Sequence, residues 1–388
     1  MKITEGIYFK NFKKKKINRK ILNILSTTFK QDSNILDSLN RSYKDSYKKE
    51  LVLKLKKYSN INLIGMGGSI LGSRAIYNFL KKKIRSRFNF LDNFEEKRFD
   101  LKNKKNQLNL IISKSGNTLE TISNSNVLIK NLDKNIFITE NKRSYLMDLA
   151  KKLKSDVIHH NNFIGGRYSV LSEVGMLPAE LMGLNPNKFR RLNFLIKNKK
   201  FINSLVQNVS NTLHLVKKKK FNSVILNYDN NSKDLFFWYQ QLIAESLGKK
   251  SQGILPIVSD MPKDNHSLMQ LYLDGFKNNF YTFFFINDNF SKKINNNLLL
   301  ETHSYLKNKS LNEIKLSQFN ATEKVFKRKK IPFRSFLIKK RNEETLGELF
   351  VFFILETILL GKAMNLNPYD QPAVELIKME TKKFLLKS

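Results

Sequence analysis

Residues 108–118 read LNLIISKSGNT, and this stretch indicates the fold. An apolar run, Leu108 to Ile112, ends abruptly in polar residues, and a helical pattern follows. The turn between them carries the hydroxyls of Ser113, Ser115 and Thr118. Hydroxyls and free backbone N–H groups at a helix N-terminus attract anions, because the unpaired amides and the helix dipole both favour negative charge. The grouping predicts a site for a compact phosphate rather than a long polyanion.

A second turn, GMGGSILG at residues 65–72, also follows an apolar run and precedes a helical pattern. Its glycines let a ligand approach the backbone, and Ser69 beside Gly68 adds a hydroxyl. The turn does not match the dinucleotide fingerprint, because Gly72 comes too late, and it lacks the lysine of a nucleotide P-loop. Parallel strands point their carboxyl ends the same way, so we expect both turns to face one crevice.

Strand-like apolar runs alternate with helical patterns along most of the chain, which predicts βαβ units and parallel sheets covered on both faces. We expect strands at 61–64, 108–112, 135–139 and 156–159, and, in a second series, at 223–227, 281–286 and 333–338. We interpret the chain as two α/β sandwiches with a helical tail. The expected divisions are an N-terminal helical segment at 1–50, sandwiches at 51–185 and 200–342, and C-terminal helices at 343–388.

The chain of 388 residues carries 70 Lys and Arg against 33 Asp and Glu, a formal net charge of +37. Such a charge favours binding to nucleic acids or membranes. However, lysine runs such as Lys81 to Lys83 and Lys327 to Lys330 are scattered along the sequence, without aromatic interleaving or a nucleic-acid-binding signature. We interpret the charge as compositional drift, and we expect no specific nucleic-acid partner and no membrane partner.

The composition excludes several kinds of site. No cysteine occurs, so disulfides, thiolate nucleophiles and Cys-ligated zinc are impossible. The histidines and carboxylates show no metal-ligand spacing, so we expect no metal. The apolar stretch Leu349 to Leu360 is short and contains Glu356, which is typical of a buried helix rather than a membrane span. The first residues lack the apolar core of a signal peptide, and we therefore expect a cytoplasmic protein.

Two further segments carry residues suited to chemistry. Gly165 and Gly166 precede Arg167, whose guanidinium presents a rigid fork of donors to an oxyanion. Gln241 and Glu245 lie four residues apart on one helical face, and a carboxylate placed there can serve as a general base. Each signal also has an ordinary interpretation, namely a surface arginine beside a turn and a solvated glutamate paired with a lysine.

The last two signals concern His266 and the C-terminal region. His266 is the best placed of the five histidines for acid–base chemistry, because it follows a polar turn and precedes a helical stretch. Gln371 precedes Pro372, which fits the first turn of a helix, and Lys378 would lie two turns after Gln371 on the same face. A structural histidine and an ordinary cap followed by a surface lysine are the competing interpretations.

Taken in order, these segments resemble the glucose-6-phosphate isomerase family. The resemblance runs from about Gly65 to Lys378. Its most distinctive parts are GGRYSVLSEVGMLPAELMG at 165–183 and NPYDQPAVELIK at 367–378. It implies an α/β protein with two sugar-isomerase (SIS)-type sandwich domains, each with a parallel-rich sheet flanked by helices, and a C-terminal helical segment. It also implies a homodimer without metal or organic cofactor.

The activity that the resemblance implies is the reversible interconversion of glucose 6-phosphate and fructose 6-phosphate through a cis-enediol(ate), after ring opening. Glu245 would move a proton between C1 and C2, and Arg167 would stabilise the intermediate. Lys378 and His266 would assist ring opening, with His266 reaching the site of the partner subunit.

The other implied site residues would bind the sugar phosphate. They are Gly68, Ser69, Ser113, Lys114 (mainly through its backbone), Ser115, Thr118, Gly166, Gln241 and Gln371. Two alternatives remain open at this point: a dual phosphoglucose/phosphomannose isomerase, and a non-catalytic sugar-phosphate-binding regulator on the same fold. The joint presence of Glu245, Arg167, His266 and Lys378 argues against a pure binder, which needs no base.

Overall fold

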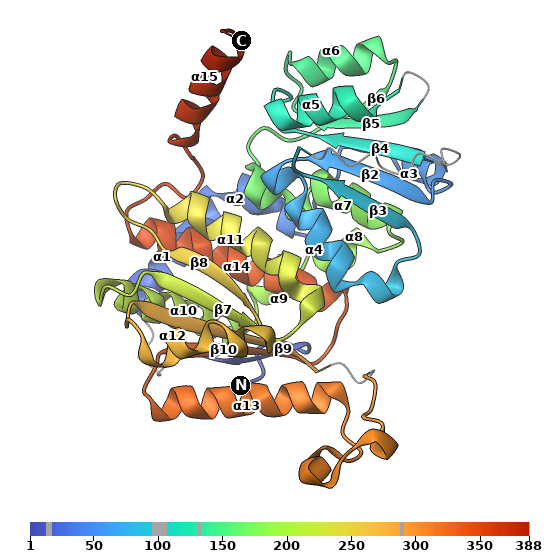
Figure 1. Cartoon of the computed structure of the whole chain (residues 1–388). Helices are drawn as coiled ribbons and strands as arrows, with labels where there is room; N and C mark the ends of the chain where they lie inside the picture. The colour runs from blue at the N-terminus through green and yellow to red at the C-terminus, as the bar shows by residue number, and fades with distance from the viewer. Residues whose placement is uncertain (13–17, 95–106, 131–132, 288–290, 388) are drawn as a thin grey trace.

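A computed structural model gives the arrangement of the chain and describes residues 1–12, 18–94, 107–130, 133–287 and 291–387. Two five-stranded sheets lie in separate layers, with helices between and around them (Figure 1). This α/β architecture with parallel-rich sheets confirms the predicted fold class.

The first sheet has the strand order β3-β2-β4-β5-β6 and all its strands are parallel. The strands are β2 (Asn60–Gly65), β3 (Arg87–Leu91), β4 (Gln107–Ile112), β5 (Lys134–Thr139) and β6 (Asp156–His159). Gly65 is in register with Ile112, so β2 and β4 end side by side. The two polar turns expected from the sequence therefore start at the same edge of this sheet.

Both faces of the first sheet are covered. Ile64, Ile111 and Phe137 pack on one face with Leu146 and Ala150 of α6. The alternate strand residues face the large central core. The helices of this half are α3 (Lys49–Leu55), η2 (Gly67–Ser69), α4 (Leu71–Phe79), η3 (Lys81–Lys83), α5 (Leu119–Leu128), α6 (Tyr145–Lys152), η5 (Gly166–Leu171) and α7 (Glu173–Leu181), where η denotes a 3-10 helix. Burial on both faces explains the continuous apolar runs of β2, β4 and β5.

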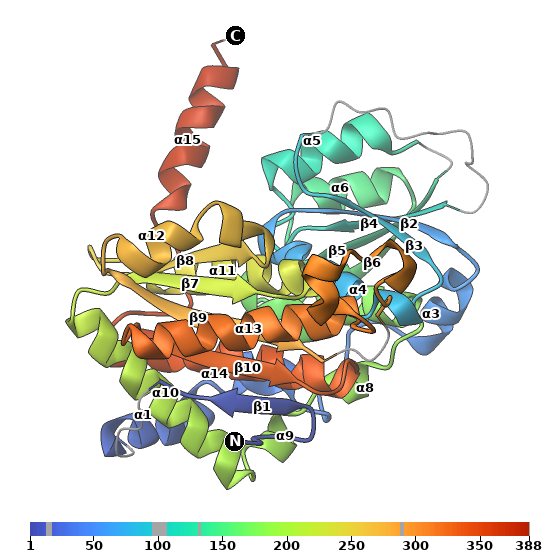
Figure 2. The ribbon, with the colours of Figure 1, turned by 60° about the horizontal axis from the view of Figure 1, so that its bottom comes forward.

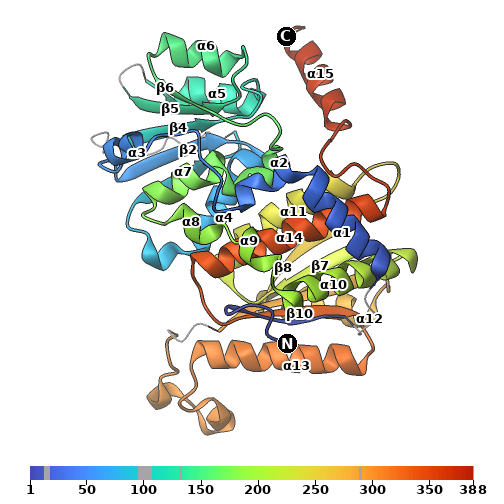
Figure 3. The same ribbon diagram turned by 180° about the vertical axis from the view of Figure 1, so that it is seen from behind.

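The second sheet has the order β1-β10-β9-β7-β8, in which β1 alone is antiparallel. The strands are β1 (Ile7–Lys10), β7 (Asn222–Asn227), β8 (Leu255–Asp260), β9 (Asn279–Ile286) and β10 (Phe333–Ile338). Helix α13 (Leu311–Arg328) covers one face, where its Phe319 and Phe326 pack on Phe283 (Figure 2). Helices α1 (Arg19–Gln31), α10 (Lys199–Lys217) and α14 (Glu343–Ala363) lie on the other side (Figure 3).

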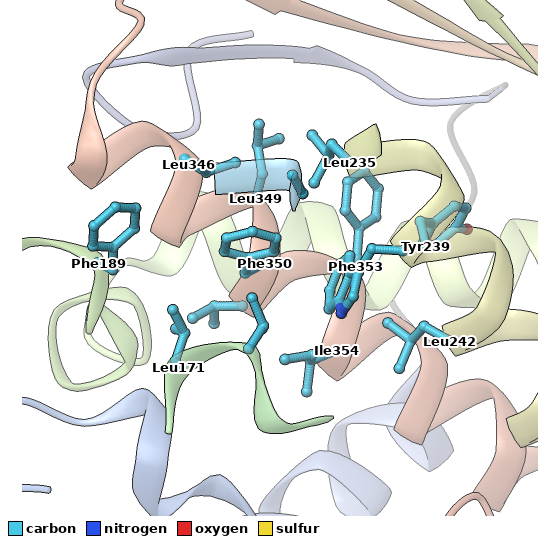
Figure 4. Close-up of a cluster of buried hydrophobic side chains, with 14 of the residues drawn as sticks. Leu171, Phe189, Leu235, Tyr239, Leu242, Leu346, Leu349, Phe350, Phe353 and Ile354 are labelled. Carbon is cyan, nitrogen blue, oxygen red and sulfur yellow. The ribbon is translucent and has the colours of Figure 1, made fainter. Parts of the chain in front are cut away.

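Helix α14 joins the two halves. It is buried along nearly its whole length, and its sequence is apolar on all sides, as expected of a helix between two layers. The rings of Phe353 and Tyr239 lie 4.5 Å apart, and those of Phe350 and Trp238 lie 4.8 Å apart. Figure 4 shows Phe350 and Phe353 of α14 among side chains of α11 (Lys233–Leu247) and of η5, such as Leu171. The predicted buried helix at 349–360 is thus confirmed.

The remaining elements are short connections and one terminal helix. They are α2 (Ser33–Leu36), η1 (Asp37–Leu39), α8 (Pro186–Phe189), α9 (Leu192–Leu195), η6 (Asn230–Ser232), η7 (Lys263–His266), α12 (Met269–Asp274), η8 (Asn296–Leu298), η9 (Glu301–Leu306) and α15 (Val374–Leu385). Helix α15 projects from the body of the molecule in all three ribbon views (Figures 1–3). Within the described ranges, no helix has the length and apolar character needed to cross a membrane.

Three strands differ from the sequence expectations. Residues 1–50 were expected to be helical, but β1 lies among them and pairs with β10 at the edge of the second sheet. Strands β3 and β8 were not expected either, and both are edge strands with partly exposed faces. Edge strands bury one side only and tolerate residues such as Pro256 of β8, so they lack a continuous apolar run.

Candidate functional site

The turn after β4 presents its hydroxyls beside the start of α5. Ser113 is buried, and its Oγ lies 2.9 Å from Thr118 Oγ1. Ser115 Oγ accepts a hydrogen bond from the Asn117 backbone N–H (3.2 Å). Thr118 is the N-cap residue of α5, but its side chain does not cap the helix. The amides of the first helical turn are therefore not satisfied by that side chain, which is the arrangement that attracts an anion.

Gly116 shapes this turn. Its φ is +66°, in the left-handed region that favours glycine, and a methyl group at this position would lie 2.2 Å from Ser144 Oγ. Lys114 contributes differently from its neighbours, because its Nζ donates to the carbonyl of Asn162 (2.6 Å) and lies 3.4 Å from Glu140. The ammonium is thus engaged by protein oxygens, while the backbone of Lys114 forms part of the turn.

The turn after β2 packs directly against the segment that carries Arg167. A methyl group at Gly68 would lie 2.1 Å from the carbonyl carbon of Gly166, so only glycine allows these backbones to approach this closely. A methyl group at Gly67 would lie 2.6 Å from Gln241 Nε2. Ser69, at the end of η2, is half-buried. The glycines therefore bring three distant parts of the sequence together.

Arg167 is buried, and its guanidinium is surrounded by acceptors. NH1 donates to Glu245 Oε2 (3.1 Å) and to Gln371 Oε1 (2.7 Å). Nε donates to Ser246 Oγ (2.8 Å), and NH2 donates to the carbonyls of Pro368 (2.7 Å) and Asp370 (3.0 Å). An arginine has five N–H groups, so these five bonds use all of them.

Glu245 lies in the last turn of α11, next to Arg167. Its Oε2 accepts the hydrogen bond from Arg167, and its Oε1 accepts one from Gln241 Nε2 (2.8 Å). The side chain remains 33% exposed, in contrast to the buried arginine. Among the residues that the structure describes, Gln241 Oε1 is buried without a hydrogen-bond partner, so this amide has an acceptor to offer to another group. A carboxylate held between a cation and an amide, yet open on one side, suits proton transfer to a bound molecule.

The sequence analysis did not single out Tyr168 and Ser246, which hold this centre. Tyr168 is buried, and its OH lies 3.0 Å from Ser246 Oγ and donates to the Pro368 carbonyl (2.9 Å). Burial raises the pKa of Tyr168, so the phenol stays protonated and acts as a donor. Each of the two is the sequence neighbour of a chosen residue, Arg167 or Glu245, and this proximity is the only signal that could have identified them.

The segment before α15 is fastened to the same centre. Besides the bonds from Arg167, Lys249 forms an ion pair with Asp370 at 2.6 Å. The hydrogen bond from Lys249 lowers the pKa of the Asp370 carboxyl. Gln371 is thereby held at Arg167.

His266 and Lys378 are not brought to this centre. His266 is exposed in η7, and no described hydrogen bond or ion pair joins it to Arg167 or Glu245. Lys378 is 65% exposed in α15 and pairs with Glu375 (2.7 Å). No residue of α15 is buried. The absence of His266 from this chain's own centre agrees with the expectation that it reaches the site of the partner subunit, whereas Lys378 was expected at the centre and does not lie there in the single chain.

No group of three or more His, Asp or Glu side chains in the described ranges is arranged to hold a metal ion.

Comparisons with known proteins agree with this arrangement. The sequence profile of the phosphoglucose isomerase family matches residues 53–259. A glucose-6-phosphate isomerase of Methanocaldococcus jannaschii is 34% identical over 351 residues, which cover 85% of this chain and 84% of the relative. A glucose-6-phosphate isomerase of Campylobacter jejuni is 32% identical over 351 residues, which cover 85% of this chain and 86% of the relative.

Two solved structures share the fold. A hypothetical protein from Thermus thermophilus superimposes with a TM-score of 0.81 at 23% identity, covering 95% of this chain and 94% of the other. A glucose-6-phosphate isomerase from Chlamydia trachomatis has a TM-score of 0.72 at 17% identity, covering 98% of this chain and 89% of the other.

Proposed function

Because the chain belongs to the phosphoglucose isomerase family, we propose that it interconverts glucose 6-phosphate and fructose 6-phosphate. The observation that carries the proposal is the contact between Arg167 and Glu245, 3.1 Å apart and beside the glycine-rich turn at 65–72. Aldose–ketose interconversion needs a base for a carbon-bound proton and an electrophile for the developing oxyanion. It also needs an anchor away from the reacting carbons, because remote binding energy positions them.

In the proposed mechanism, the phosphate binds at the hydroxyls of Ser69, Ser113, Ser115 and Thr118 and at the backbone near Lys114. Gly68 and Gly166 allow the sugar to lie against the backbone between this anchor and Arg167. The substrate thus spans from the edge of the first sheet to the C-terminal end of α11.

Glu245 then removes the proton from C2 of the open-chain aldose and returns it to C1, and the reverse reaction uses the same path. The electron pair released from the C–H bond forms the enediolate, whose oxyanion on O1 is stabilised by Arg167, and a proton moves from O2 to O1 as the ketone forms. Since all five N–H groups of Arg167 have protein acceptors, the oxyanion replaces one acceptor, and we propose Gln371 on NH1. Gln371 and Gln241 then contact the sugar hydroxyls.

We also propose a cytoplasmic homodimer. In it, His266 of one subunit completes the other subunit's site and assists ring opening together with Lys378. The exposed position of His266 leaves it available to a second chain. Ile377 and Phe384 of α15 are 71% and 72% exposed, and a second subunit would cover such apolar side chains. The proposed substrate favours a cytoplasmic location, because charged sugar phosphates do not cross membranes unaided.

No observation favours the alternatives. A regulator that only binds sugar phosphates would not require a carboxylate held open beside a guanidinium. A preference for mannose 6-phosphate has no specific residue to support it, and the relatives described above carry the name glucose-6-phosphate isomerase.

The test is a coupled assay of fructose 6-phosphate conversion with the parent protein and with Glu245→Gln. We expect turnover in the parent. In the variant we expect kcat to fall by roughly 100- to 10,000-fold, the range supplied by a general base, with the affinity for substrate retained. Glu50→Gln, a substitution on the exposed surface of α3, should leave both parameters unchanged. An inactive but folded parent would contradict the proposed function.

A further inference from the structure

A buried polar cluster that the proposed mechanism does not use lies at His160 and Glu173. Their side chains are 1% and 0% exposed, and His160 Nδ1 lies 2.5 Å from Glu173 Oε1. His160 Nε2 lies 3.1 Å from the carbonyl oxygen of Ile164. A carbonyl only accepts hydrogen bonds, and so does an ionised carboxylate. Both ring nitrogens of His160 therefore face acceptors, and the ring links the Glu173 carboxylate to the Ile164 carbonyl.

The other contacts of Glu173 support its ionised form. Its Oε1 accepts the Asn161 backbone N–H (3.2 Å), and its Oε2 accepts the Tyr43 hydroxyl (2.7 Å). Burial opposes ionisation, but the hydrogen bonds from His160 and Tyr43 outweigh it, and the pKa of Glu173 lies below its ordinary value. Glu173 is also the first residue of α7, where the helix dipole favours negative charge.

The position of this pair in the chain is informative. His160 directly follows β6, and Glu173 opens α7, so the two residues close a loop over 160–173. Arg167 lies in the middle of that loop. The contact between His160 and Glu173 thus fastens the two ends of the segment that presents Arg167.

Support of this kind acts just before Arg167, where Gly165 and Gly166 have no side chains of their own to fix the backbone. Among the described residues, a methyl group at Gly165 would find only Tyr168 within 4 Å, at 3.5 Å. The bond from His160 to the Ile164 carbonyl holds the backbone immediately before this glycine pair. On the other side, Ser169 Oγ donates to the Gly166 carbonyl (2.7 Å).

We propose that His160 and Glu173 are positioning residues for the isomerisation, which set the place of Arg167 by clamping the loop at 160–173. The inference rests on the role of Arg167 as oxyanion stabiliser under the proposed function. No described hydrogen bond joins the pair to the hydroxyls of Ser113, Ser115 or Thr118. The clamp therefore acts on the transition state more than on phosphate binding, and its loss affects kcat rather than KM.

The principal variant is the double substitution His160→Leu with Glu173→Met. It removes both side chains together, so neither is left buried without its partner, and the protein should fold. We expect kcat for fructose 6-phosphate to fall roughly 10- to 100-fold, as for a reacting group displaced by about 1 Å, with KM nearly unchanged. His160→Gln keeps a donor for the Ile164 carbonyl, and its kcat should lie closer to the parent value than that of the double variant.

Two further measurements separate positioning from general stability. In an Arg167→Met background, the double substitution should cause no additional loss of kcat, because its effect passes through Arg167. Hydrogen exchange of the amides at 164–168 should be faster in the double variant than in the parent. Arg341→Met with Asp229→Leu removes another ion pair, of 2.6 Å, and should leave this exchange and kcat unchanged.

These experiments distinguish failure of the clamp proposal from failure of the proposed isomerase function. An inactive parent refutes the isomerase proposal, while faster exchange at 164–168 still supports the clamp. A folded double variant with parental kcat and parental exchange contradicts the clamp. So does a loss of kcat that stays the same size in the Arg167→Met background. If the double variant does not fold, His160→Gln is compared with His160→Ala. A kcat as low and an exchange at 164–168 as fast in His160→Gln as in His160→Ala contradicts the clamp equally.

Discussion

Arg167 donates hydrogen bonds to five protein acceptors from two separate parts of the chain, 245–246 and 368–371. The glycines before it, and the position of Gln241 and Glu245 on one helical face, indicated these three residues as candidates, and hydrogen bonds join them in the folded chain. The partners Tyr168 and Ser246 could not be expected, because nothing in their local sequence distinguishes them from ordinary core residues. For His266 and Lys378 the reverse holds, because they were identified from the sequence but do not lie at Arg167. Their motifs match the family, but the single chain does not hold them at Arg167.

Individual residues of the turn at 113–118 should determine substrate affinity. We expect Ser113→Ala combined with Thr118→Ala to raise KM for fructose 6-phosphate by about tenfold or more, since hydrogen bonds to a charged group contribute about 1.5–3 kcal/mol each. The effect on kcat should be small, because the phosphate is remote from C1 and C2. Steady-state kinetics measure both values. Ser123→Ala, in the helix α5 that follows this turn, is the control. An unchanged KM in the double variant would place the phosphate elsewhere.

Among the elements, the interior strands and the edge strand β6 were predicted from the sequence, whereas the edge strands β1, β3 and β8 were not. In β3, the sequence RFNFL includes Asn89, which counts against a strand by propensity. In the folded sheet, Asn89 donates to Asn62, which donates to Asn109, which in turn donates to Asn135, all at 2.9 Å. These strand residues are in register, so a polar ladder replaces apolar packing there. Propensity rules treat each residue alone and cannot anticipate such a ladder.

The N-terminus of α14 contains an ion pair whose contribution to stability can be measured. Glu343 pairs with Lys83 (2.7 Å), which connects α14 to the first half of the molecule. Burial raises the pKa of Glu343, but the bond from Lys83, the backbone and the charge of Lys188 outweigh it, so its pKa lies below the ordinary 4.5. We expect Glu343→Gln to lower the free energy of unfolding at pH 7 by about 0.5–1 kcal/mol.

The pH dependence follows from the same shift. A lowered pKa stabilises the fold above pH 4.5, and this contribution is lost as the pH falls through the folded-state value. We therefore expect the difference in the free energy of unfolding between the parent and Glu343→Gln to shrink on acidification. Urea unfolding at pH 7, 5 and 4 measures it. Glu344→Gln is the control, since its contact with Lys188 is 4.0 Å and weaker. A difference that grows on acidification would contradict the assignment.

For the whole molecule, one core unites both sheets, and we propose 51–185 and 200–342 as its two domains. The extended placement of α15 is a property that no sequence rule specified, because an amphipathic helix predicts a partner surface but not which one. The net charge of +37 is a second whole-molecule property. We keep the interpretation that it reflects composition, so any binding to DNA should be weak and abolished by salt.

The proposed dimer makes a prediction about mixed subunits. Glu245→Gln and His266→Ala should each be inactive alone. After mixing and subunit exchange, half of the dimers are mixed, and each mixed dimer has one site with both native residues. Activity should therefore recover to about one quarter of the parental value. Recovery is excluded if His266 acts within its own chain, and unmixed variants kept under the same conditions serve as the control.

The central claim is that Glu245 transfers a proton between C1 and C2 at Arg167. It is tested most directly with glucose 6-phosphate deuterated at C2, converted in ordinary water and analysed by mass spectrometry. We predict that part of the deuterium is lost to the solvent during turnover by the parent, because the base that carries it is 33% exposed, and that Glu245→Gln abolishes both turnover and exchange. Turnover with complete retention of deuterium, or exchange that persists in Glu245→Gln, would contradict the claim.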